Sequence, residues 1–183
     1  VHVYLALQEL IARECPAISE TALTIGQFCA GSASNVIPET AVLQGTMRSF
    51  DEKTMSHLIA RLNEIVPSVA GAYRTKAEIE VISDIPIVRC NEELNQEIVE
   101  GLKELEPELK AVCTYHVMGS EDFAYISQKI PASYMCIGAG IEEVSKRYVE
   151  HNPKVRFHES ALVKGAAIYA GTAMRWLDLH GNQ

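Results

Sequence analysis

Asn35 and Arg48 are two side chains whose types together suggest ligand binding. Asn35 stands in a stretch of small and polar residues typical of a loop, and Arg48 ends a run rich in strand-forming residues. A guanidinium presents a planar fork of N–H donors that matches a carboxylate at two points, and an amide adds a donor beside it. The two residues can therefore converge on one carboxylate. The alternative is an exposed strand arginine and a turn asparagine.

Two adjacent acids, Glu121 and Asp122, lie in the sequence Gly-Ser-Glu-Asp-Phe at 119–123. Acids at the start of a helix usually interact with free backbone N–H groups and with the helix dipole. Two carboxylates can also support the ligands of a metal ion. The local pattern favours helix capping and leaves the metal interpretation open.

His151 is followed by Asn152 and Pro153, and the proline predicts that this histidine lies in a loop. His151 and the later His158 therefore do not form a helical pair of metal ligands. A loop histidine can still present one neutral ring nitrogen to a metal ion. The alternative is a surface histidine whose ring nitrogens have other partners.

The elements that must position these residues fall into two halves, and residues 1–84 predict the order α-β-β-α-β. One more strand at the front gives the ferredoxin-like order β-α-β-β-α-β, so we expect a strand upstream of Val1. Pro67 should kink or end the second helix. The predicted elements are a helix with Val3, Leu7, Leu10 and Ile11 on one face, strands Thr21–Phe28 and Ala41–Arg48, a helix from a Ser49–Glu52 capping box to Val66, and strand Glu78–Ile82.

Residues 85–183 predict alternating helices and strands, as in α/β proteins. The strands are too few to bury the helices, so we expect the rest of the sheet to come from an upstream segment as well. The predicted elements are helix Asn91–Leu105 capped by Asn91, strand 112–117, short helix 121–128, strand 133–137, and a last helix from Ser160 with Leu162, Val163, Ala166, Ala170, Ala173 and Leu177 facing inward.

The composition of the 183 residues excludes several classes of protein. A formal net charge of -8 argues against nucleic-acid binding, which depends mainly on lysine and arginine. No apolar run is long enough to span a bilayer. The five cysteines are scattered and never spaced as C-x-x-C, which disfavours a disulfide framework and indicates the reducing cytoplasm.

Four motifs occur in the order seen in the hippurate hydrolase and indole-acetyl-amino-acid hydrolase family of two-metal aminoacylases and carboxypeptidases, and the chain resembles that family over almost its whole length. The resemblance implies an α/β protein with an α+β lid. Residues 1–84 would be the ferredoxin-like lid or dimerisation domain without its first strand. Residues 85–183 would be the C-terminal part of a three-layer α/β zinc-peptidase-like catalytic domain. The motifs are Gly31–Pro38, Gly45–Arg48, Gly119–Phe123 and His151–Pro153.

The resemblance also implies roles for individual residues. Asn35 and Arg48 match the lid residues that bind the substrate carboxylate, and His151 matches the C-terminal metal ligand. The family has an aromatic residue at the position of Val155 and an acid at that of Arg156, so the loop after His151 is expected to pack differently. No residue of this chain matches a catalytic residue.

The implied activity is hydrolysis of the amide bond of N-acyl amino acids or small peptide-like substrates. Two divalent ions (Zn, Mn or Co) per complete active site would activate the attacking water. The family's Cys-Gly-His-Asp motif, its Glu-Glu pair with the general base and a further histidine ligand do not occur in this sequence. We therefore expect this chain alone to be inactive, and the resemblance implies a homodimer formed through the lid.

Two other functions are compatible with the residues. One is a non-enzymatic amino-acid-binding or dimerisation module derived from that family. The other is a thiol hydrolase that uses a cysteine with His116 or His151, although no cysteine lies in a recognisable nucleophile motif.

Overall fold

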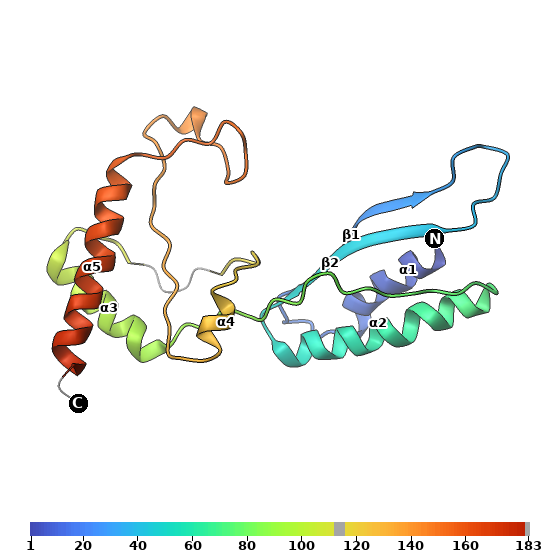
Figure 1. Ribbon diagram of the computed structural model, residues 1–183, viewed down its shortest axis with the longest axis horizontal. Helices are drawn as coiled ribbons and strands as arrows, with labels where there is room; N and C mark the ends of the chain where they lie inside the picture. The colour runs from blue at the N-terminus through green and yellow to red at the C-terminus, as the bar shows by residue number, and fades with distance from the viewer. Residues whose placement is uncertain (112–115, 182–183) are drawn as a thin grey trace. The chain divides into compact units, whose positions relative to one another are not determined.

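The computed structural model describes residues 1–111 and 116–181, which form two compact units (Figure 1). The first unit contains Val1–Ile87 and His116–Ala124, and the second contains the described residues of Val88–Tyr115 and Tyr125–Gln183. The sequence places the boundary at residue 84, so the first unit continues slightly further and takes in a segment from the second half. The mixed helix and sheet class is confirmed, while the assignment of the units as lid and catalytic part stays a prediction.

The first unit is built on an antiparallel hairpin of β1 (Thr21–Ala30) and β2 (Ala41–Ser49), close to the predicted strands. Thr21 pairs with Ser49 at one end and Ala30 with Ala41 at the other. A bulge between Ile25 and Gln27 shifts the register by one residue.

Two helical segments pack on one face of this hairpin. They are α1 (His2–Glu9), which continues as the π-helical turn η1 (Leu10–Glu14), and α2 (Glu52–Ala72). Alternation along the strands sends one set of side chains to this face and the other set outward, with Met47 on the core face and Arg48 on the outward face. The core consists of buried Leu7, Leu10, Leu58 and Val66, with Leu23, Ile25 and Met47 of the hairpin packed against them.

Helix α2 differs from its prediction at both ends. Asp51 caps it by accepting the Thr54 N–H at 2.7 Å, so the Ser49–Glu52 capping box is wrong. The helix also does not end at Pro67 but continues to Ala72. Val66 and Ala70 are buried on either side of the proline, and this packing offsets the loss of one backbone donor.

The strand predicted at Glu78–Ile82 is wrong, because that stretch pairs with no neighbour among the described residues. Ala77 and Ile79 pack against the core as the alternation indicates, but Val81 and Ile82 are 62% and 82% exposed. Alternation indicates which side chains can be buried, whereas a strand also needs a partner for its hydrogen bonds.

The second unit is organised around α3 (Glu92–Leu105) and α5 (Ser160–His180), with the short α4 (Ala124–Ser127) at the unit boundary and a 3-10 turn η2 (Val144–Lys146). Asn91 caps α3 as predicted, accepting the Leu94 N–H at 2.8 Å. An ion pair between Arg175 and Glu104 at 2.7 Å and a hydrogen bond between Nε2 of His180 and the Glu97 carboxylate at 3.1 Å join α5 to α3.

Two further predictions in this unit are wrong, and a third lies mostly outside the described residues. No strand forms at 133–137, because these residues have no ladder partner in the described chain. The face of α5 predicted to point inward is exposed in the described chain, since Leu162 and Val163 are each 75% exposed, and α5 meets α3 with another face. Residues 112–115 of the predicted strand 112–117 lie outside the described residues. None of the described helices has the length and apolarity needed to cross a membrane.

Candidate carboxylate-binding site

Arg48 lies near the end of β2, opposite Ala22, on the hairpin face that points away from the core. It is half-buried, and its Nη1 donates a hydrogen bond to the backbone carbonyl of Met118. Met118 directly precedes the Gly-Ser-Glu-Asp-Phe motif, so the structure brings the first and second sequence clusters together. Among the described residues, no carboxylate lies within 4.0 Å of the Arg48 guanidinium.

The segment His116–Ala124, called the docking segment below, reaches the same end of the hairpin through a second group of contacts. The Phe50 N–H donates to the Glu20 carbonyl at 3.4 Å, which continues the strand pairing by one step. The Glu20 carboxylate lies 3.3 Å from Nδ1 of His116. The rings of Phe50 and His116 are 5.3 Å apart between centroids. Sequence reasoning missed these contacts, because nothing local links residue 20 to residue 116.

Asn35 lies far from this group, in the loop that joins the two strands. Ala41 borders that loop, whereas Arg48 lies seven residues along β2, about 23 Å away at the usual rise of a strand. A single carboxylate cannot reach both side chains over that distance. The structure therefore does not bring Asn35 and Arg48 together within one chain.

Glu121 of the docking segment makes local hydrogen bonds. The Glu121 side chain accepts the Phe123 N–H at 3.4 Å, and the Glu121 backbone carbonyl accepts the Ala124 N–H at 3.1 Å. These contacts shape the turn that leads into α4, which agrees with the capping interpretation more closely than with a metal ligand.

His151 lies in a turn of the second unit, as Pro153 predicts, with a left-handed φ of 67°. The Asn152 side chain stabilises this turn by accepting the Lys154 N–H at 2.9 Å. A non-glycine residue with this φ carries strain of about 1–2 kcal/mol and is worth considering as a functional position. His158 has a different use, because its Nδ1 lies 2.7 Å from the Ser160 hydroxyl at the start of α5.

The described residues do not form a metal centre by themselves. No group of three or more His, Cys, Asp or Glu side chains in this part of the chain is arranged to hold a metal ion. His151 is therefore not part of a three-donor group in the described chain. A catalytic zinc site needs about three protein ligands, so one histidine does not make such a site.

The cysteines also give no support to a thiol hydrolase. Of the four described cysteines, none has its sulfur hydrogen-bonded to a histidine, and Cys113 lies outside the described residues. Burial, followed by the neighbouring charge of Glu14, raises the pKa of the Cys15 thiol. A raised pKa leaves less of the reactive thiolate.

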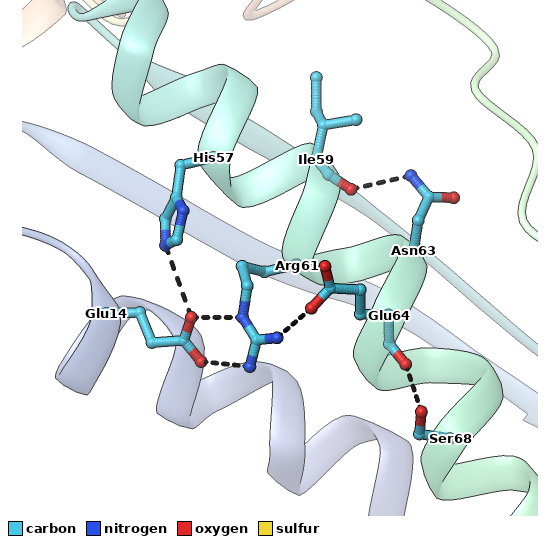
Figure 2. Close-up of polar contacts among 7 residues, drawn as sticks. All are labelled: Glu14, His57, Ile59, Arg61, Asn63, Glu64 and Ser68. Atoms are coloured by element: carbon cyan, nitrogen blue, oxygen red, sulfur yellow. Dashed lines mark hydrogen bonds and ion pairs between the residues drawn. The ribbon is translucent and has the colours of Figure 1, made fainter.

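A cluster of charged side chains joins η1 to α2 on the core side of the hairpin (Figure 2). Glu14 of η1 accepts from Nε of Arg61 at 2.6 Å and from its Nη2 at 2.9 Å, and Nε2 of His57 lies 3.5 Å from the same carboxylate. Arg61 also donates to Glu64. The hydrogen bonds from Arg61, and then its charge and that of His57, hold the pKa of Glu14 below its usual value. The cluster is satisfied internally, so its role is to join the helices.

The family model of peptidase family M20/M25/M40 matches residues 7–175. The chain belongs to this family. IAA-amino acid hydrolase ILR1-like 2 of Arabidopsis thaliana is 30% identical over 179 residues, which cover 96% of this M20 chain and 40% of that protein. Thermostable carboxypeptidase 2 of Saccharolobus solfataricus is 30% identical over 172 residues, or 93% of this chain and 43% of that one. The M20 chain thus spans about two fifths of the length of these relatives.

Two solved structures share the fold. An aminohydrolase from methicillin-resistant Staphylococcus aureus superposes with a TM-score of 0.81 over 94% of this M20 chain and 44% of its own, at 24% identity. YXEP of Bacillus subtilis, described as a dinuclear metal-binding peptidase, superposes with a TM-score of 0.75 over 97% of this chain and 45% of its own, also at 24% identity. At this identity the likeness establishes the fold alone.

Proposed function

We propose that this chain is the carboxylate-binding part of a metal-dependent amidohydrolase. The substrates are N-acyl amino acids or small peptide-like molecules with a free carboxylate. The observation that carries the proposal is the state of Arg48. It is half-buried, held by a backbone carbonyl, and without a carboxylate within 4.0 Å among the described residues.

Arg48 acts by binding and orientation. Its hydrogen bond to the Met118 carbonyl uses one N–H and limits rotation of the guanidinium. The remaining N–H groups can take a substrate carboxylate at two points, which fixes the direction of the rest of the molecule. Asn35 lies at the other end of the hairpin, so within one chain it does not share the carboxylate that Arg48 binds.

The complete enzyme holds two divalent ions (Zn, Mn or Co), and His151 supplies one ligand. The strained φ of His151 supports this role, and the described residues of this chain hold no group of three donors that could complete the site. The chain alone is therefore inactive. We also propose that the complete enzyme is cytoplasmic and forms a homodimer through the first unit.

The experiment is a turnover assay of the purified 183-residue chain with N-acetyl-L-amino acids and added Zn²⁺, Mn²⁺ or Co²⁺. We expect no hydrolysis and no stoichiometric tight metal, because one histidine holds zinc weakly. Metal-dependent turnover by this chain would contradict the division of ligands proposed above.

A second candidate is a binding or dimerisation module without catalysis, and the lack of a three-donor metal group among the described residues favours it. The two functions differ when the chain is combined with the remainder of an M20 relative's catalytic domain. Recovered amidohydrolase activity supports the enzyme, whereas ligand binding without any recovered activity supports the module.

A further inference from the structure

We propose that Glu20 is a specificity-determining residue that disfavours acidic amino acids at the Arg48 site. The inference rests on the proposed function, because it assumes that Arg48 binds the carboxylate of an amino-acid conjugate. The preferred substrate is then a conjugate whose amino acid has a neutral side chain.

The register of the hairpin places Glu20 on the same face as Arg48. Ala22 lies directly opposite Arg48, and Glu20 precedes it by two residues. Glu20 adjoins the start of β1, and the Phe50 N–H bond to its carbonyl continues the strand pairing, so its side chain shares the outward face with Arg48. Diagonal neighbours of this kind are about 7–8 Å apart. Ala22 is small and does not fill the space between them. A carboxylate bound at Arg48 therefore meets the negative charge of Glu20 on this face.

The docking segment holds Glu20 in this place. Nδ1 of His116 lies 3.3 Å from the Glu20 carboxylate, and Phe50 packs its ring against the imidazole at 5.3 Å. The Glu20 side chain is 56% exposed, so His116 limits its orientation without burying it. The charge remains accessible to a substrate while pointing toward the docking segment.

A substrate held by its α-carboxylate at Arg48 projects its amino-acid side chain into these surroundings. A second carboxylate there meets the charge of Glu20 at a separation of several ångströms, with only partial screening by water. Coulomb repulsion of this size changes affinity by about three- to tenfold. A neutral side chain has no such penalty.

The test is calorimetric titration of the 183-residue chain with N-acetyl-L-aspartate and N-acetyl-L-asparagine at about pH 8, where ordinary imidazoles are neutral. These ligands differ in one charge and have almost the same shape. We expect the wild-type chain to prefer the asparagine conjugate, and Glu20→Gln to reduce this preference about three- to tenfold. Glu9→Gln is the matched control, because Glu9 lies on α1, which packs on the opposite face of the hairpin.

The Arg48→Met variant distinguishes a failure of the Glu20 proposal from a failure of the proposed carboxylate site at Arg48. One outcome overturns the role of Glu20 and leaves the carboxylate site standing. In that outcome the wild-type chain binds the asparagine conjugate, Arg48→Met abolishes this binding, and Glu20→Gln leaves the preference for asparagine over aspartate unchanged. If neither ligand binds the wild-type chain, or if Arg48→Met binds as well as wild type, both are overturned. Circular dichroism of each variant verifies that the fold is retained.

Discussion

At the scale of single residues, the arginines of the first unit differ in what they contact. Arg61 reaches Glu14 and Glu64, and Arg13 pairs with Glu9, so the charges of both are matched within the protein. Arg48 contacts a backbone carbonyl, and no described carboxylate pairs with it. A half-buried charge with no opposite charge beside it is costly to maintain, which is why binding, rather than stability, accounts for Arg48 best.

From the Glu14–Arg61 contact we predict how the stability of the folded chain changes with pH. The pKa of Glu14 is lower in the folded chain than its usual value of 4.5, so the folded state binds its proton less readily than the unfolded state. The stabilisation is therefore fully present above the unfolded pKa and is lost as the pH falls through the folded pKa. We expect the wild-type chain to melt at a higher temperature than Glu14→Gln at about pH 6, and the difference to shrink as the pH falls below 4.5.

Glu9→Gln serves as the comparison, because Glu9 forms only an exposed pair with Arg13 at 3.6 Å. Its melting temperature should follow that of the wild-type chain across the same pH range. A Glu14→Gln difference that stays constant down to about pH 2 would show that the carboxylate charge of Glu14 is not what stabilises the contact.

At the scale of elements, α3 and α5 pack closely where a glycine faces a long side chain. A Cβ on Gly101 would lie 2.6 Å from Cδ of Arg175, which is held by Glu104, whereas a Cβ on Gly165 would meet no atom within 4 Å. We expect Gly101→Ala to lower the free energy of unfolding by about 1–3 kcal/mol. Gly165→Ala should raise it by up to about 1 kcal/mol, because alanine favours the helix.

Urea denaturation of the two variants, measured side by side, tests the packing of α3 on α5. Equal effects of the two substitutions would mean that the helices do not meet at Gly101. The comparison uses one change of residue in two helices of the same unit, so helix propensity alone cannot produce the difference.

Sequence patterns predicted the elements whose signals are local. The hairpin strands, the Asn91 cap and the loop position of His151 each depend on residues close together in the chain. Predictions failed where tertiary packing decides. Pro67 lies inside α2 because buried residues flank it, and residues 78–82 form no strand because no described neighbour pairs with them.

The candidate site likewise has features that local sequence indicates and features that depend on long-range contacts. Residue types alone drew attention to Arg48 and His151, but their roles came from family resemblance. The contacts of Arg48 with Met118 and of Glu20 with His116 join residues about 70 to 96 positions apart. No periodicity or motif encodes such contacts, so only the folded chain reveals them.

At the scale of the whole molecule, the chain consists of two units, with the proposed carboxylate site in one and the proposed metal ligand in the other. It spans about two fifths of the length of its relatives, and its described residues hold no three-donor metal group. Binding without turnover is the behaviour that this combination predicts for the chain on its own.

The most direct test of that claim is a titration of the wild-type chain with N-acetyl-L-phenylalanine and with its carboxamide, which lacks the carboxylate. A charge-assisted, two-point contact with Arg48 should make the carboxylate bind at least about tenfold more tightly than the amide. Arg48→Met should remove this difference, and Arg48→Lys, which keeps the charge but not the fork, should retain part of it. Equal binding of carboxylate and amide by the wild-type chain would contradict the account.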